Sequence, residues 1–73
     1  MDDRTLLAGI GEALFGPNWK ADIYRELEVS DRSVRNWITD NKVPTGVWRD
    51  LTVLLADRKE AIDSLLAELR TRA

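Results

Sequence analysis

The sequence predicts an all-α protein: a single domain over residues 1–73 with about five short helices. Apolar residues recur every three or four positions along most of the chain, which is the spacing of one helix face. Turn-forming and helix-capping residues separate these apolar segments. A chain of 73 residues can enclose one small core but is too short for a deep enzymatic cleft.

The first helix is predicted from Thr5 to Phe15. Its apolar residues are Leu6, Leu7, Ile10, Ala13, Leu14 and Phe15. Gly9 and Gly11 lower its intrinsic helicity, and two interpretations of them remain open: they allow another helix to approach closely, or they are merely tolerated. The segment 16–18 ends the helix, because glycine suits a left-handed cap and proline cannot continue a helix.

Two short amphipathic segments meet at residues 28–30, within the stretch 20–38. Their apolar positions are Ile23, Leu27, Val29, Val34, Trp37 and Ile38. These side chains converge only if the chain turns sharply, which is the hydrophobic pattern of a helix-turn-helix. Ser30 is a strong N-cap for the second helix, and Asp31 follows it at the positive end of the helix dipole.

This stretch resembles the helix-turn-helix of Cro and lambda-repressor-like (XRE-type) DNA-binding proteins. With Lys20 as the first motif position, the family's apolar positions hold Ile23, Leu27, Val29, Val34 and Trp37, and its usual cap position holds Ser30. Tyr24 departs from the family's small residue, and Glu28 departs from its turn glycine. Glycine suits a left-handed turn, so Glu28 indicates mild strain or a different turn. The resemblance implies a lambda-repressor-like fold whose second helix binds the major groove of double-stranded DNA.

The predicted base-reading residues lie at the start and on the outer side of this second helix. They are Ser30, Asp31, Arg32 and Asn36. Arginine presents two donors that match guanine, and asparagine matches the edge of adenine. A solvated helix face is the alternative interpretation. Asp31 either accepts a hydrogen bond from cytosine or pairs with Arg35 four residues on, and the second interpretation is preferred.

The predicted phosphate contacts are distributed over three regions of the chain. They are Lys20, Ser33, Arg35, Asn41, Lys42 and Thr45. The resemblance places Lys20 near the DNA backbone, and it places the predicted loop 39–46 along the phosphates; a solvated connector is the alternative for the loop. Thr45 is predicted to cap a fourth helix whose first amides face a phosphate. Trp19 and Trp48 are predicted to belong to the core.

The C-terminal region permits two interpretations. Asp57 and Glu60 resemble a capping box, which indicates a new helix over about 58–71. Apolar residues also follow an alternating four-three spacing from Leu51 to Leu69, interrupted by Arg58, which is compatible with one continuous helix. A break near Asp57 is preferred.

A stripe of apolar residues in this region is wider than a last helix can easily hide in so small a domain. It consists of Ile62, Leu65, Leu66 and Leu69. The stripe either seals the monomer core or forms a two-fold interface. Because helix-turn-helix proteins commonly bind palindromic sites, we expect a homodimer.

Charge is weakly polarised along the chain. The 11 basic and 13 acidic side chains give a formal charge of −2. Residues 18–49 contain six basic and five acidic residues, a net +1, so the remainder, with five and eight, carries −3. We expect modest non-specific DNA affinity, strong salt dependence, and a need for two subunits to gather enough phosphate contacts.

The amino-acid composition argues against several classes of function. The chain has no cysteine and no histidine, so we expect no disulfide, no metal site of the common kind, no cofactor and no enzymatic activity. No small-molecule ligand is evident. No apolar run approaches the roughly 18 residues that cross a bilayer, and the start lacks the features of a signal peptide. We expect a cytoplasmic protein without membrane contact.

These observations predict sequence-specific binding of duplex DNA by a small transcriptional regulator, most simply a repressor, with a phage or mobile-element origin as one interpretation. Two other classes remain open. One is a helical protein-binding module such as an antitoxin or adaptor, and the other is an architectural DNA-binding factor.

Overall fold

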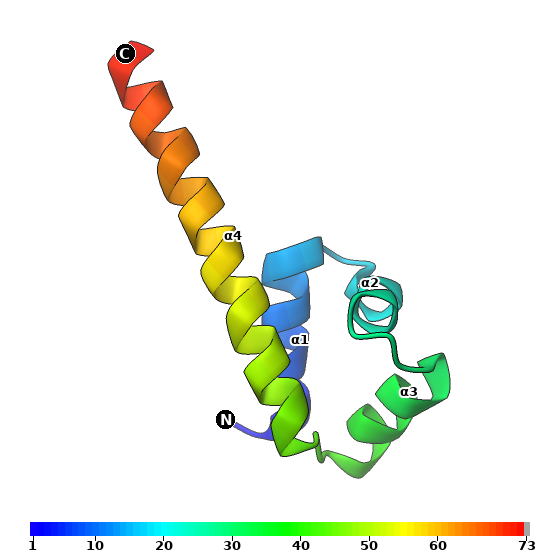
Figure 1. The fold of residues 1–73 in the computed structure, drawn as a ribbon. Coiled ribbons are helices and arrows are strands. Elements are labelled where there is room, and N and C mark those ends of the chain that lie inside the picture. The colour runs from blue at the N-terminus through cyan, green and yellow to red at the C-terminus, as the bar shows by residue number, and fades with distance from the viewer. Residues whose placement is uncertain (73) are drawn as a thin grey trace.

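The computed structural model describes residues 1–72, and Ala73, the last residue of the predicted domain, lies outside them. The described chain forms four α-helices and no strand: α1 (Asp3–Phe15), α2 (Trp19–Glu26), α3 (Asp31–Asp40) and α4 (Thr45–Arg72). Helix α1 contacts the other three, and α2 also contacts α3. Figure 1 shows α1 between the first half of α4 and the α2–α3 pair. The all-α prediction is confirmed, but the number of helices is four and not five.

The core is small and is shared by all four helices. Its buried residues are Leu7, Leu14, Trp19, Ile23, Val34, Val43, Val47 and Leu51. Leu7, Ile23, Val34 and Leu51, one from each helix, are completely buried. The predicted core position of Trp19 is confirmed, and Trp48 packs against this core while remaining partly exposed. Burial of apolar side chains from each helix is therefore what holds α2 and α3 against α1.

Helix α1 and the start of α2 approach closely at Gly11. A Cβ built on Gly11 would lie 2.5 Å from two ring atoms of Trp19, whereas one on Gly9 would meet nothing within 4 Å. The two glycines of α1 therefore have different explanations. Gly11 makes room for the buried indole, and Gly9 is tolerated.

The turn after α2 uses a left-handed residue. Glu28 has φ 55°, and the amide of Val29 donates to the carbonyl of Tyr24 at 3.0 Å while the Glu28 amide donates to Arg25 at 3.3 Å. This pair of hydrogen bonds is the Schellman ending, in which glycine is usual. Glu28 thus adopts the conformation for which glycine is favoured, at some steric cost. Tyr24 is accommodated as a partly buried side chain against the core.

Helix α3 begins as predicted. The Ser30 hydroxyl oxygen accepts from the backbone amide of Ser33 at 3.0 Å, which satisfies one of the free amides at the helix start. The helix continues to Asp40, so the connection to α4 spans only residues 41–44, shorter than the predicted loop 39–46.

The start of α1 fixes this short connection. A carboxylate oxygen of Asp3 accepts from the Val43 amide at 2.8 Å. The Arg4 amide donates to the side-chain oxygen of Asn41 at 2.9 Å. These bonds, between residues 40 and 37 positions apart in sequence, hold the end of α3 near the beginning of α1.

Helix α4 is continuous over 28 residues, so the predicted break near Asp57 and the separate helix 58–71 are wrong. The segment 57–60 contains no glycine or proline, and three of its four residues, Arg58, Lys59 and Glu60, are good helix formers in a helix interior. The guanidinium of Arg58 donates to the carbonyl of Leu14 at 2.6 Å, which fastens α4 to the end of α1. Thr45 is the first residue of α4 and not the cap before it; the carbonyl of Pro44 accepts from the Val47 amide.

The second half of α4 extends away from the other helices (Figure 1). Every residue from 56 to 72 is exposed, and the described chain measures 47 × 22 × 20 Å. Two ion pairs along the helix, Lys59 with Asp63 and Arg72 with Glu68, have N–O distances of 2.9 Å. In the part of the chain described, no helix combines the length and the apolar character that a membrane span requires.

Candidate functional site

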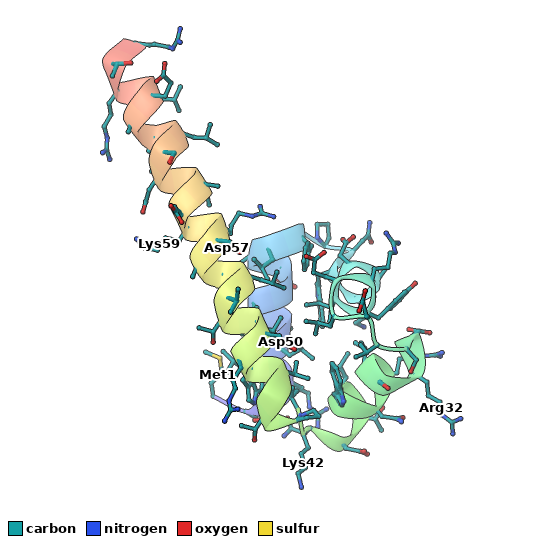
Figure 2. All side chains as sticks on the ribbon, viewed as in Figure 1. Met1, Arg32, Lys42, Asp50, Asp57 and Lys59 are labelled. Carbon is teal, nitrogen blue, oxygen red and sulfur yellow. The ribbon has the colours of Figure 1, made fainter. Side chains whose placement is uncertain are left out.

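The outer side of α3 displays charged and polar side chains on a well-anchored helix. Val34 is buried, and Trp37 and Ile38 pack against the core. The 3.6-residue period therefore turns Arg32 and Asn36 to the opposite side, where both are exposed. Figure 2 shows Arg32 projecting away from the body of the molecule.

Arg32 and Asn36 have no side-chain hydrogen bond or ion pair to any of residues 1–72. Being four residues apart, they lie one turn from each other on the same side of α3. Their donors and acceptors are consequently available to a ligand. A guanidinium and a carboxamide in this position can form two hydrogen bonds each to a planar partner.

Asp31 and Arg35 form an ion pair with an N–O distance of 2.6 Å, so the preferred interpretation of Asp31 is confirmed. Both side chains are more than half exposed. Exposed pairs of this kind contribute only about 0.3–0.5 kcal/mol, so a ligand can exchange either partner at little cost. Ser30 and Ser33 are held more firmly, since their hydroxyl oxygens lie 3.0 Å apart within the helix cap.

The predicted phosphate-contacting residues outside α3 occupy two places. Asn41, Lys42 and Thr45 follow one another around the short connection between α3 and α4. Lys42 and Thr45 are exposed, whereas Asn41 is half-buried and its oxygen is already bonded to the Arg4 amide. Lys42 points outward from this connection (Figure 2). Lys20 lies elsewhere, exposed in the first turn of α2, with its ammonium 5.8 Å from the centre of the Trp19 ring.

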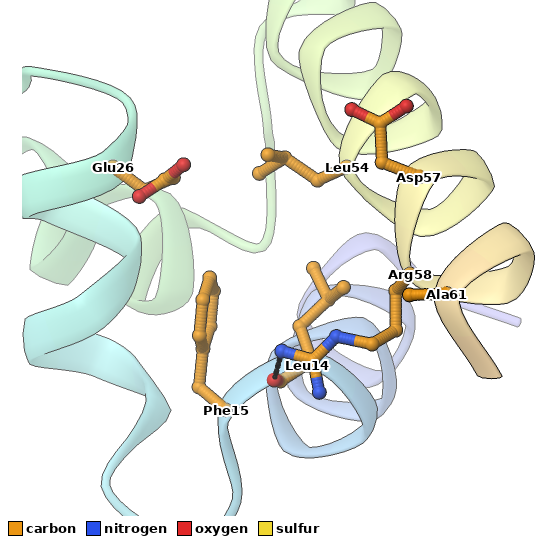
Figure 3. A pocket seen from close by; sticks show the side chains of 7 residues that line it. All are labelled: Leu14, Phe15, Glu26, Leu54, Asp57, Arg58 and Ala61. Atoms are coloured by element: carbon orange, nitrogen blue, oxygen red, sulfur yellow. Dashed lines mark hydrogen bonds between the residues drawn. The ribbon is translucent and has the colours of Figure 1, made fainter. Parts of the chain in front are cut away.

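A groove of about 310 Å³ lies between the middle of α4 and the C-terminal ends of α1 and α2. We call it the α4 groove. Its lining consists of Leu14, Phe15, Glu26, Leu54, Asp57, Arg58 and Ala61 (Figure 3). The sequence does not reveal this groove, because the groove depends on the position of α4 relative to α2. The only signal in the sequence was Arg58, the charged residue that interrupts the four-three apolar spacing.

The apolar stripe of the C-terminal region is uncovered. Ile62, Leu65, Leu66 and Leu69 are 46%, 65%, 42% and 62% exposed. They lie on the projecting half of α4, at the opposite end of the molecule from α3 (Figure 1). The interpretation that this stripe seals the monomer core is therefore wrong.

Two surfaces emerge from this geometry: the outer side of α3 with the adjoining connection, and the projecting half of α4 with the groove at its base. No protein-family model, curated protein or solved structure matches this chain.

Proposed function

We propose that this protein binds duplex DNA sequence-specifically through the outer side of α3 and acts as a small transcriptional regulator, most simply a repressor. The observation that carries the proposal is the unpaired Arg32 and Asn36 on the exposed side of a capped helix. That helix is packed by its other side onto a small core, and a tight turn connects it to α2. These features support the proposal, because a helix-turn-helix presents its second helix to DNA from a packed and tightly turned pair of helices.

In the proposed complex, the N-terminal half of α3 lies in the major groove, which is wide enough to admit a helix. Arg32 donates two hydrogen bonds to a guanine, and Asn36 pairs with the edge of an adenine one turn along. Ser30 and Asp31 adjust which bases are accepted at the start of the helix.

Phosphate contacts orient the protein without specifying sequence. Lys42 suits this role because the bonds from Asp3 to Val43 and from Arg4 to Asn41 fix the connection that carries it. The amides of Thr45 and Gly46, the first two of α4, suit an anion since amides at a helix start lack partners within the helix. Lys20, Ser33, Arg35 and Asn41 complete the proposed set.

In the proposed complex, different residues read the bases and bind the phosphates, and substitutions test these separate roles. A binding site is first selected from randomised duplex DNA at about 0.1 M salt, where the Debye length is roughly 10 Å. Arg32→Ala should then cost about 1–3 kcal/mol on the selected site and relax the preference at one base pair. Lys42→Ala should weaken selected and random DNA alike and reduce the salt slope by about one.

Lys59→Ala is the matched control, because it removes one positive charge from the projecting half of α4, away from α3 (Figure 2). It should leave DNA affinity nearly unchanged. Equal losses on selected and random DNA for Arg32→Ala would contradict base reading by this residue. Failure to select any site would contradict the proposed function.

The uncovered stripe on α4 supports a second candidate, a helical module that binds another protein. The formal charge of −2 is also unusual for a nucleic-acid binder. Association through the stripe that is insensitive to salt, together with no retention of DNA, would favour this candidate over the first.

A further inference from the structure

We infer that two copies of this chain form an antiparallel dimer in which the C-terminal end of each α4 docks in the α4 groove of the other copy. The occupant of the groove is thus a second copy of this chain. The inference goes beyond DNA binding and does not depend on it.

The groove and the apolar stripe are parts of one continuous surface. Leu54, Arg58, Ala61 and Leu65 follow one another at spacings of four, three and four, so they share one face of α4. The first three line the groove, and the fourth belongs to the stripe. A second helix that packs along the stripe in the direction of Leu54 would therefore also contact the groove.

Charge favours the antiparallel direction. The groove contains two carboxylates, Glu26 and Asp57, and one guanidinium, Arg58, which is turned toward the carbonyl of Leu14. Neither carboxylate forms an ion pair with any of residues 1–72. The far end of α4 carries Arg72, whose ion pair with Glu68 is exposed and can be exchanged at little cost. An antiparallel pairing brings Arg72 to these carboxylates of the second copy, whereas a parallel pairing places Arg72 beside its own equivalent.

The four-three spacing of α4 defines a register for this pairing. With Ile62 opposite Leu65 of the second copy, the two-fold axis crosses α4 between residues 63 and 64. Leu69 then lies level with Arg58 of the second copy. That guanidinium is turned toward the carbonyl of Leu14, so its apolar stem is left to contact Leu69.

Arg72 lies level with Leu55 of the second copy in the same register, within one helical turn of Asp57. The long arginine side chain spans that interval. In this register, every apolar residue of the stripe faces apolar groups of the second copy. At both ends of the paired helices, charged residues lie near opposite charges.

The surface area that each pairing would bury also favours docking in the groove over a parallel pairing. A parallel pairing would use only the projecting residues 59–72, about 21 Å of helix at 1.5 Å per residue. Stable specific interfaces bury about 800 Å² on each partner. Docking of the helix end in the groove adds the surfaces of α1 and α2 to the contact, which a parallel pairing leaves uncovered.

Two charge-reversed variants test the proposal by sedimentation in the absence of DNA. Arg72→Glu and Asp57→Arg each place two pairs of like charges in the antiparallel homodimer, so each should raise the dimer dissociation constant by roughly tenfold. In an equimolar mixture, the heterodimer contains two pairs of opposite charges. The mixture should therefore recover the affinity of the unmodified protein.

Spin labels give the direction independently, because the chain has no cysteine of its own. Ser64→Cys lies close to the proposed axis, and its two labels should be near each other. Thr71→Cys lies level with residue 56 of the second copy, so its labels should be separated along the axis by about 22 Å.

Short distances at both labels would show a parallel dimer and overturn the proposal. A mixture that associates no better than its components would also overturn it, as would an unmodified protein that sediments as a monomer throughout the accessible concentration range. Since none of these measurements uses DNA, their failure is distinct from a failure of the proposed function.

Discussion

The residue type at position 11 depends on a contact with a side chain that lies eight residues later in the sequence. The indole of Trp19 occupies the space that a Cβ at Gly11 would need, and Trp19 is only 6% exposed. The buried ring has little room to move, since its other neighbours form the core. Gly9, two residues earlier on the exposed side of the same helix, has no such neighbour.

Substitution of the two glycines by alanine should therefore have opposite effects. Gly11→Ala gains about 1 kcal/mol of helix propensity, but overpacking against Trp19 costs about 1–3 kcal/mol, so we expect a net loss of stability. Gly9→Ala should gain up to about 1 kcal/mol. Urea unfolding followed by tryptophan fluorescence measures both, and a stabilised Gly11→Ala variant would contradict the close contact.

Helix α4 continues through the segment 57–60, although this segment also resembles the start of a helix. Beyond Ala56 the helix has no buried residue, so its direction relative to the other helices depends on contacts made before that point and on Arg58. The hydrogen bond from Arg58 satisfies a carbonyl in the last turn of α1, where a positive charge is also favourable.

Arg58→Met removes this bond and keeps most of the apolar stem. We expect a loss of about 1 kcal/mol in the free energy of unfolding, because a charged hydrogen bond is lost at a partly exposed site. Lys59→Met is the control: it breaks only the exposed pair with Asp63, which is worth about 0.3–0.5 kcal/mol. Equal losses for the two variants would contradict the role of Arg58.

The two proposed surfaces lie far apart on the molecule. The outer side of α3 lies at one end of an elongated chain, and the apolar stripe of α4 lies near the other (Figure 1). Residues 18–49, which carry a net charge of +1, attract phosphates only weakly as a single copy. Two copies would double the number of phosphate contacts and sharpen the dependence of DNA affinity on salt.

DNA titrations at several salt concentrations test this coupling. For Arg72→Glu, below its dimer dissociation constant, the slope of log affinity against log salt should fall to about half of the unmodified value, because half of the phosphate contacts are lost. Mixing with Asp57→Arg should restore the slope. An unchanged slope for the monomeric variant would indicate that each copy binds DNA alone.

Local sequence pattern is enough to predict the all-α class, the positions of the first three helices and the local chemistry of α3. The Ser30 cap and the pair of Asp31 with Arg35 follow from spacings of three and four residues, and such spacings act within one helix wherever it packs. The apolar period likewise predicted which residues of α3 face inward.

Contacts between residues far apart in the chain became known from the three-dimensional arrangement of the helices. It showed that Gly11 accommodates Trp19, that Asp3 and Arg4 hold the connection before α4, and that Arg58 reaches Leu14. It also showed that α4 continues through Asp57 and Glu60, whose spacing is typical of a helix start but which a helix interior also tolerates. Local pattern cannot distinguish these two uses; the packing of Leu51 and Arg58 against α1 can.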